Sequence, residues 1–289
     1  MPFVTAFYRA LGTGMVISVD SPIDDKVRSA MESLIEDYEH VLSRFRNDSL
    51  IAAIGKAEHG GSFDFPDWCA PLFDLYDALF SATSGAIDPC VGEDLIRLGY
   101  DASLSFTVTQ DAPEHLGALR GRAVWGRDVT RHGTTLVTHE PVQLDFGACG
   151  KGYLVDLLGR MLQSSQFVID AGGDLLIHAE QPISVALEDP EDQSHAIGIA
   201  HIANGALCAS APSRRHWNVA VNERTQIAIH HLLNAIDGLP AQQTEASWAY
   251  VPANATLNLA RDYPTAVADG LATALFVSDV AQLQRTFDF

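Results

Sequence analysis

The sequence predicts an α+β fold in which antiparallel sheets pack against helices. Strand-like segments gather mainly in the second half of the chain, apart from most of the helical segments, instead of alternating strictly with them. The 289 residues are 47% apolar, enough to bury the core of one large domain or two small ones. No internal repeat or low-complexity segment interrupts the chain.

The first elements are expected to be two strands and a helix. Residues 3–8 and 15–19 have strand composition and are joined through a glycine-containing turn at 11–14. From Pro22 onward apolar residues recur with helical spacing as far as Phe45. This is the most regular helical pattern in the sequence.

Further helices and a series of strands follow. A helix is expected over residues 66–84, where Gly85 fits a C-terminal cap, and another after Lys151. The last helix is expected to begin near Thr265. Strands are expected at residues 167–169, 175–178, 183–187, 196–202, 218–221 and 246–251.

The charge of the chain narrows the class of partner. Lys and Arg number 18 against 37 Asp and Glu, for a formal net charge of −19. Such a surface repels polyanions, so binding to nucleic acid or to anionic lipid is not expected. The longest basic cluster, residues 214–216, is large enough to meet one phosphate group.

The cysteines and the hydropathy pattern point to an intracellular protein. The four cysteines show no Cys-x-x-Cys spacing, which argues against a structural zinc site or a disulfide framework. No run approaches the roughly 20 apolar residues of a membrane span, so stable membrane insertion is not expected. The N-terminus lacks the pattern of an export signal, and a cytoplasmic location is expected.

Asp269 and Thr273 lie four residues apart in the predicted C-terminal helix. Positions i and i+4 share one face of a helix, so both side-chain oxygens would point the same way. Two hard oxygen ligands suit Mg²⁺. Alternatively, the aspartate could simply complement the helix dipole while the threonine bonds a carbonyl one turn back.

Three glycine-bearing turns could bring backbone N–H groups against a phosphate or a flat ring, at residues 85–92, 144–153 and 170–174. In the second, a strand enters, a glycine turn follows and a helix leaves, with Lys151 available to neutralise charge. It is not a Walker A loop, since Asp145 stands where that pattern needs glycine and Gly152 where it needs Ser or Thr.

Six short motifs resemble, in the same order, those of the ApbE-type FAD:protein FMN transferases. These enzymes cut FAD at its pyrophosphate and attach FMN to a threonine of a target protein. The family patterns Met-Gly-Thr, Ser-Arg-Phe, Phe-Asp-Pro-Thr-Val-Gly, Asp-Leu-Gly-Gly-Ile-Ala-Lys-Gly-Tyr, Asn-Ala-Gly-Gly-Asp and Ala-Asp-Ala-Leu-Ala-Thr-Ala-Leu-Phe are similar to residues 11–13, 43–45, 87–92, 145–153, 170–174 and 268–276. The resemblance covers nearly the whole chain.

The resemblance implies an ApbE-like, T-fold-related single domain over residues 1–289, with Mg²⁺ as cofactor and FAD as substrate. By the same resemblance, the metal ligands are Asp269, Thr273 and the backbone carbonyl of Ala148. The residues expected to contact FAD are Gly12, Thr13, Asp88, Val91, Gly92, Asp145, Gly147, Lys151, Gly172, Gly173, Asp174, Ser210 and Arg214. The expected macromolecular partner is an acceptor protein with a Thr-containing flavinylation motif.

The family likeness also assigns catalytic roles to Lys151 and His231. Breaking the pyrophosphate builds negative charge on the departing AMP, which Mg²⁺ and Lys151 would stabilise. The acceptor threonine needs a general base near neutral pH, and His231 stands where the family has one. His230 is its neighbour, and either histidine could instead be structural.

Several positions depart from the family pattern and leave two alternatives open. Near Ser210 and His231 they are Ala209, Asn234, Ala235 and Asp237. Gly55 stands where members commonly carry Asn or Tyr, at a position associated with the choice between hydrolysis and transfer. Residues 254–263 look like an insertion in a surface loop. The alternatives are an FAD pyrophosphatase that makes FMN and AMP, and a non-catalytic FAD-binding protein.

Overall fold

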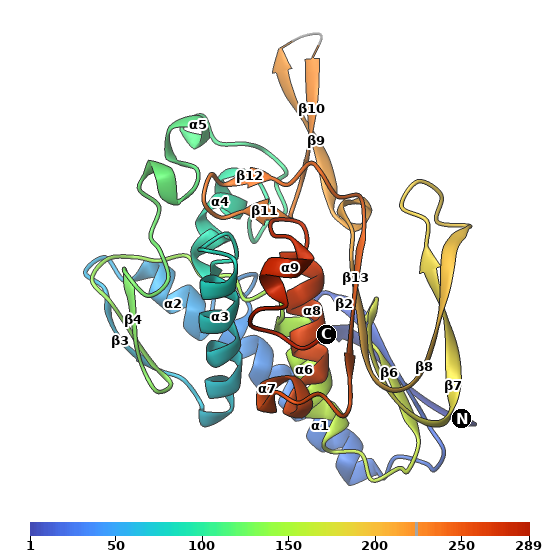
Figure 1. Ribbon diagram of the computed structural model, residues 1–289. Helices are drawn as coiled ribbons and strands as arrows, with labels where there is room; N and C mark the ends of the chain where they lie inside the picture. Colours follow the sequence, from blue (N-terminus) through green and yellow to red (C-terminus); the bar gives the residue numbers. More distant parts are fainter. Residues whose placement is uncertain (223–224) are drawn as a thin grey trace.

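A six-stranded antiparallel sheet forms one side of the molecule, in the order β1-β2-β6-β7-β8-β13 (Figure 1). The computed structural model describes residues 1–222 and 225–289, without the side chains of Arg9, Arg214, 220–222 and 225–227. The strands of this sheet are β1 Phe3–Ala10, β2 Thr13–Val19, β6 Phe167–Asp170, β7 Asp174–Glu188, β8 Ala196–Ser210 and β13 Ser247–Pro252.

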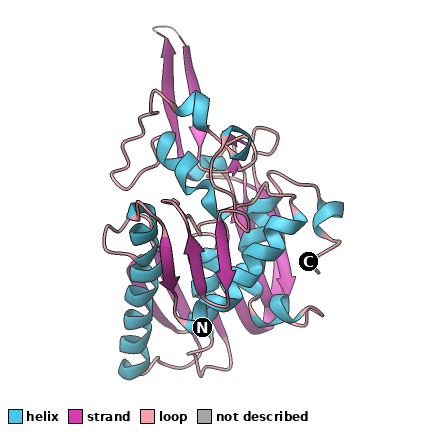
Figure 2. Cartoon of the chain, turned by 90° about the vertical axis from the view of Figure 1, so that its left-hand side faces the viewer, coloured by secondary structure: helices cyan, strands magenta, loops and turns pink. Residues whose placement is uncertain are grey.

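Helices cover one face of this sheet. In the view of Figure 2 the long first helix stands beside the strands, and helices α6 and α8 contact β7, β8 and β13. The helices are α1 Asp25–Leu42, α2 Leu50–Lys56, α3 Ala70–Ala82, α4 Gly92–Arg97, α5 Ala112–His115, α6 Gly150–Gly159, α7 Asn258–Asp262, α8 Pro264–Ala274 and α9 Val280–Leu283. Within the described residues, none of them has the length and apolar character to cross a membrane.

Three smaller sheets complete the fold. One has three strands in the order β3-β5-β4, and the other two are hairpins of β9 with β10 and β11 with β12. The β9–β10 hairpin projects from the top of the molecule in Figure 1. These strands are β3 Gly61–Asp64, β4 Val129–His132, β5 Thr135–Thr138, β9 His216–Asn222, β10 Thr225–His230, β11 Leu233–Asn234 and β12 Leu239–Pro240.

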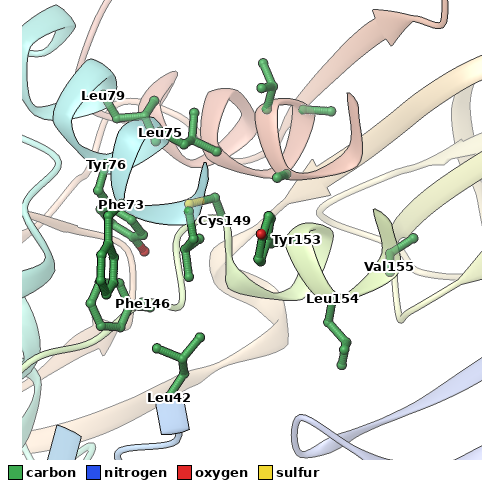
Figure 3. Packing of buried hydrophobic residues seen from close by; sticks show 14 of the residues in the cluster. Leu42, Phe73, Leu75, Tyr76, Leu79, Phe146, Cys149, Tyr153, Leu154 and Val155 are labelled. Atoms are coloured by element: carbon green, nitrogen blue, oxygen red, sulfur yellow. The ribbon is translucent and has the colours of Figure 1, made fainter. Parts of the chain in front are cut away.

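The main core lies between the helices and the large sheet. Along β2 alternate residues point inward, so Met15, Ile17 and Val19 are buried while Val16 is exposed. Figure 3 shows how α3 and α6 meet, with the side chains of α3 lying against those around Cys149. Burying each large apolar side chain contributes about 1.5–3 kcal/mol, so this cluster holds the helices in fixed positions.

The predicted elements are mostly confirmed, but several differ in extent; α3 covers less than the expected 66–84, and β8 continues beyond the expected 196–202. The first helix begins at Asp25, after the N-cap Asp24, and ends at Leu42, so Phe45 lies outside it with 42% of its surface exposed. The segments expected as two strands at 175–178 and 183–187 form the single strand β7, which has a register shift between them. Because the register shift interrupts the alternation of inward and outward side chains, the sequence pattern resembled two separate strands.

The segment 254–263 was expected to be a surface-loop insertion, and this is only partly right. It contains the short helix α7, which packs on α8, and Ala255 and Ala260 are buried. Small apolar residues at these positions allow the segment to pack against the core. The segment therefore supports the N-terminal end of α8.

Candidate active site

Helices α6 and α8 pack unusually closely, and glycine makes this possible. A Cβ atom on Gly152 would lie 2.3 Å from the backbone oxygen of Thr265, closer than any side chain could approach. Further along α6, the buried carboxylate of Asp156 accepts hydrogen bonds from the backbone N–H groups of Thr265 (3.1 Å) and Ala266 (2.8 Å). Asp156 thereby caps the start of α8 and fixes its position on α6.

This packing places Lys151 between two buried carboxylates. Its Nζ lies 2.7 Å from Oδ2 of Asp174 and 3.3 Å from Oδ1 of Asp269. The backbone N–H of Gly152 also donates to Oδ2 of Asp269 at 3.0 Å. Both carboxylates are 1% exposed, whereas the lysine side chain keeps 34% of its surface exposed. The lysine is therefore the element of this cluster that a ligand from solvent can reach.

The electrostatics of the cluster leave it short of positive charge. Burial and the neighbouring carboxylate of Asp174 together raise the pKa of Asp269 to about 7, although Lys151 opposes the change. Burial by itself lowers the pKa of Lys151, but the carboxylates of Asp174 and Asp269 outweigh it and raise the pKa above its usual value. One ammonium thus faces two buried carboxylates, so the site favours a further cation.

Thr273 contacts the same turn as Asp269. Its Oγ1 donates to the backbone oxygen of Ala148 at 3.2 Å and lies 3.4 Å from Oγ of Ser210. The carboxylate of Asp269 and the hydroxyl of Thr273 therefore both face the segment from Ala148 to Gly152, as the i and i+4 spacing predicts.

An ion pair holds the turn before α6. The guanidinium of Arg44 donates through Nε to Oδ2 of Asp145, and its Nη1 donates to the backbone oxygen of Tyr100 at 2.6 Å. Asp145 in turn accepts from the backbone N–H of Gly147 at 2.6 Å. The backbone N–H of Ala148 donates to the Tyr76 hydroxyl at 3.2 Å. Arg44 was not among the predicted site residues, although the Ser-Arg-Phe motif that contains it was a signal.

The structure distinguishes the roles of the two adjacent histidines. Nδ1 of His230 accepts from the backbone N–H of Leu232 at 3.3 Å, and its Nε2 donates to the oxygen of Ala241 at 2.9 Å. Among the described residues His231 is hydrogen-bonded only through Nδ1, which lies 3.2 Å from the oxygen of Arg215 and must donate to it. Nε2 of His231 therefore carries a free lone pair, while His230 is fixed by the fold.

Burial keeps His231 neutral. Burial, with a smaller contribution from nearby Lys151, lowers the pKa of the imidazole to about 4, while the hydrogen bond to Arg215 acts in the opposite direction. The side chain of His231 keeps part of its surface exposed, so a substrate hydroxyl can reach it. A neutral imidazole with a free nitrogen can accept a proton at neutral pH.

The glycine-containing turn at 11–14 lies against the turn at 170–174. Gly12 ends the two-residue turn between β1 and β2, and a Cβ on Gly172 would lie 2.9 Å from Oγ1 of Thr13. The backbone N–H groups of Gly172 and Gly173 both point to Oδ1 of Asp170, at 3.0 and 3.3 Å. The carboxylate of Asp170 therefore accepts from the same two backbone N–H groups that the sequence analysis expected to contact FAD.

The third turn lies deeper in the protein. Asp88 is buried, accepts from the backbone N–H of Cys90 at 2.7 Å and pairs with the buried Arg122 at 3.5 Å. A Cβ on Gly92 would lie 2.7 Å from the oxygen of Gln143. Val91 packs against the small apolar cluster that includes Trp217 and Leu98. The contacts of these three residues are therefore with other parts of the protein interior. The side chain of Arg214, also predicted to contact FAD, lies outside the described residues.

The donor atoms around Asp269 suit a hard divalent cation. They comprise carboxylate, hydroxyl and carbonyl oxygens of Asp269, Thr273 and Ala148. Oδ2 of Asp174 is buried and, although close to Lys151, accepts no well-formed hydrogen bond from the described residues. No cluster of three or more His, Cys, Asp or Glu side chains suited to a metal occurs among those residues.

Sequence comparison places these features in a known family. A profile of the ApbE family matches residues 11–288. A protein of Klebsiella pneumoniae named FAD:protein FMN transferase is 23% identical over 282 residues, covering 93% of this chain and 76% of that protein. A protein of Treponema pallidum with the same name is 27% identical over 286 residues, covering 87% and 72%.

Solved structures show the same fold. The ApbE protein of Thermotoga maritima superposes with a TM-score of 0.76 at 19% identity, covering 97% of this chain and 89% of that one. The flavin transferase ApbE of Vibrio cholerae also gives a TM-score of 0.76 at 19% identity, covering 98% and 89%. The predicted α+β fold with antiparallel sheets and packed helices is confirmed.

Proposed function

The chain belongs to the ApbE family, and on this premise we propose that it is a FAD:protein FMN transferase. The reaction joins the FMN half of FAD to a threonine of an acceptor protein through a phosphoester bond and releases AMP. Curated relatives that carry this name support the transferase activity. The threonine, the AMP product and dependence on Mg²⁺ are parts of the proposal.

The observation that carries the proposal is the cluster around Lys151. A partly exposed ammonium, two buried carboxylates and a hydroxyl meet at the start of α6, near a neutral histidine. The cluster can neutralise a pyrophosphate on one side and accept a proton on the other. A protein that only stored FAD would need the first property but not the second.

The chemical step follows from these two properties. Oγ of the acceptor threonine attacks the phosphorus of the FMN half, and its proton passes to Nε2 of His231. The bond between that phosphorus and the bridging oxygen breaks, and AMP leaves with this oxygen. The ammonium of Lys151 stabilises the charge that develops on the phosphate oxygens.

Asp269, Thr273 and the backbone oxygen of Ala148 would hold Mg²⁺ in this scheme. When bound, the ion supplies charge neutralisation and Lewis acidity at the pyrophosphate. Asp174 completes the negative environment and holds Lys151 in place. We further propose that residues 1–289 act as one domain, since the site uses residues from Thr13 to Thr273.

An FAD pyrophosphatase is the second candidate, because of Gly55. The side chain of Gln143 fills the space beside this glycine, and a Cβ there would lie 2.5 Å from its Oε1. The Gln143 side chain donates to the Gly55 oxygen at 3.0 Å. Gly55 also lines a cavity of about 240 Å³ together with Arg44 and Lys56, where water can enter.

Incubation with FAD, Mg²⁺ and a threonine-containing acceptor peptide tests the proposal. A transferase adds the mass of FMN to the peptide and releases AMP in equal amount. A pyrophosphatase releases AMP and free FMN with or without the peptide. Binding of FAD with no AMP release would reject both enzymatic functions.

A further inference from the structure

The turn that follows His231 is held firmly at one residue. Ala235 is buried, and its backbone N–H donates to the oxygen of Ala86 at 3.0 Å. Its own oxygen accepts from the backbone N–H of Ala118 at 3.2 Å and from Nη2 of Arg122 at 2.7 Å. The backbone at Ala235 is therefore fixed by two distant segments of the chain.

The turn 235–238 also packs backbone to backbone against residues 117–122. Gly117 and Gly238 have φ angles of 76° and 73°, and a Cβ on Gly117 would lie 2.3 Å from the backbone carbon of Asp237. Chains this close leave no room for a side chain. The two segments therefore cannot move independently of each other.

Arg122 brings a buried charge to this contact. Its side chain is fully buried, and Nη1 lies 3.5 Å from Oδ2 of Asp88. Nε lies 2.8 Å from Oδ2 of Asp94, in an ion pair without the alignment of a hydrogen bond. Oδ1 of Asp94 accepts from the backbone N–H of Gly117 at 2.8 Å. The guanidinium thus joins both carboxylates to the turn 235–238.

Stability alone does not explain these buried charges. Burial raises the pKa of Asp94 to about 6, although Arg122 and the backbone N–H of Gly117 lower it. A buried ion pair often stabilises a protein no more than apolar residues of similar volume, because desolvation offsets the attraction. Apolar residues, however, cannot hold a carbonyl oxygen in a fixed place. The position that the network gives to the turn is the better explanation for it.

His231 lies between this turn and a projecting hairpin. The β9–β10 hairpin, which ends at His230, extends away from the body of the molecule (Figure 1). On the other side, residues 232–233 are buried and lead directly into the turn. The ring of His231 has one hydrogen bond among the described residues, to the oxygen of Arg215. Its position therefore depends on the backbone that the turn anchors.

We propose that Arg122 is a positioning residue, which holds the turn 235–238 and thereby sets where Nε2 of His231 meets the acceptor hydroxyl. This proposal rests on the proposed function, in which His231 is the base. A reacting group that is misplaced by about 1 Å can lose about 10²-fold in rate. Because its side chain is fully buried, Arg122 acts on the reaction through the turn and not by contact with the substrate.

Two variants of the full-length protein separate positioning from stability. Arg122→Lys keeps a cation beside Asp94 but replaces the three nitrogens that reach both Asp94 and Ala235 by one. Arg122→Met combined with Asp94→Asn removes the closest charge pair together, so that Asp94 is not left as an unpaired charge. In the double variant the asparagine can still accept from Gly117, and Asp88 keeps its hydrogen bond from a backbone N–H.

Arg160→Lys is the matched control. Arg160 also donates to the carbonyl of a distant segment, through Nη2 to the oxygen of Asp262 at 2.6 Å. It lies just past the C-terminal end of α6, whereas Lys151 and the site are at the other end of this helix. The control can lower the denaturation midpoint, but it should leave the base as it is in the wild type.

Two properties are measured for each folded variant. The first is the split between kcat and KM for FAD in transfer to the acceptor peptide. The second is the pKa of His231 in the protein without FAD, from NMR titration of the histidine ring signals, assigned with His231→Ala. The charged and titratable groups that act on this ring are Lys151, Asp145 and His230, and none of them is changed in the variants.

Both Arg122 variants are expected to lose about 10–100-fold in kcat with KM for FAD unchanged, because a displaced base weakens the chemical step and not FAD binding. The pKa of His231 should rise from about 4 toward its usual value of about 6.5, because the released turn admits water.

A wild-type kcat, or an unshifted His231 pKa, in the folded double variant would overturn the proposal and leave Arg122 with a structural role only. A shifted pKa in a protein that releases no AMP would instead reject the transferase function, while the control of His231 by Arg122 would be supported.

Discussion

The side chains of Asp174 and Asp269 give the site its need for positive charge. Both are buried, and Lys151 is the cation that lies between them. An uncompensated charge in such a place is costly, because removal of a buried partner costs about 3–5 kcal/mol. The same negative environment that would destabilise an empty site allows it to bind a divalent cation.

Asp269→Asn is expected to lower AMP release from FAD by two orders of magnitude or more. The amide keeps the shape and can still accept from the backbone N–H of Gly152, but it has lost the charge that binds the metal. The measurement is the initial rate over a range of Mg²⁺ concentrations. Asp279→Asn, at the exposed cap of α9, is the matched control and should keep the wild-type rate. An unchanged rate in Asp269→Asn would show that this carboxylate does not bind the metal.

His231 should give the reaction a distinctive pH profile. Because burial lowers its pKa to about 4, the base is already deprotonated at pH 6, where an ordinary histidine would be mostly protonated. The value of kcat/KM should therefore fall on the acid side only near pH 4–5. His231→Ala should bind FAD normally and lose about 10²–10⁴ in transfer rate.

The neighbouring histidine provides the comparison. His230→Ala removes a ring whose two nitrogens both bond the backbone, so it should destabilise the fold more than it affects the chemical step. A normal labelling rate in His231→Ala, or a profile that bends near pH 6.5 in the wild type, would exclude His231 as the base.

The contact between helices α6 and α8 controls the geometry of the site. Gly152→Ala would place a methyl group against the Thr265 backbone, and the helices would have to separate. Overpacking of this kind costs about 1–3 kcal/mol. We expect a lower denaturation midpoint and a loss of activity larger than the loss of stability explains. Gly126→Ala is the comparison, because a Cβ there meets nothing within 4 Å. Any fall of its denaturation midpoint reports the cost of the left-handed backbone without overpacking. Equal midpoints for Gly152→Ala and the wild type would contradict the close approach.

Asp156 should make the stability of α8 depend on pH. Burial raises its pKa from 3.8 to about 7, although two backbone N–H groups lower it. The folded protein then binds more protons than the unfolded chain between about pH 4 and 7. The contribution of Asp156 to the free energy of unfolding therefore falls as the pH rises through that window. The slope should be about 1 kcal/mol per pH unit between pH 5 and 7.

Asp156→Asn removes that titration while keeping one acceptor for the start of α8. Its free energy of unfolding should therefore fall less than that of the wild type between pH 5 and 8, as measured by urea denaturation. Asp24→Asn, at the exposed cap of α1, should keep the wild-type slope. Identical slopes in the wild type and Asp156→Asn would show that the carboxylate is ionised throughout.

Helices with strong periodicity were predictable, whereas short elements were not. The helices α1, α3, α6 and α8 were expected because each has apolar residues at helical spacing over ten residues or more. The seven-residue α2 and the four-residue strands β3, β4 and β5 are too short for a period to emerge. Their formation depends on contacts with distant parts of the chain.

The local part of the site could be predicted, and the contacts between distant segments could not. The spacing of Asp269 and Thr273 gave their common orientation, since it depends on one helix. Nothing in the sequence indicated that Asp174 would meet Lys151, or that Asp170 would take up the N–H groups of Gly172 and Gly173. These contacts arise from the order of strands in the large sheet.

The fold as a whole brings the two ends of the chain to one site. Lys151 in the middle of the chain and the carboxylate and hydroxyl of α8 near the C-terminus meet there, and Thr13 near the N-terminus lies against Gly172. The net charge of −19 disfavours the approach of a dianionic substrate. A bound cation is therefore expected to increase FAD affinity, more so at low ionic strength.

Mass spectrometry of an acceptor peptide after incubation with the protein, FAD and Mg²⁺ tests the central claim most directly. The proposed chemistry predicts one FMN added to the threonine, one AMP released for each addition, and neither product when EDTA removes the metal. Release of AMP without any labelled peptide, or labelling that continues in EDTA, would contradict metal-dependent transfer at the site formed by Lys151, Asp269 and Thr273.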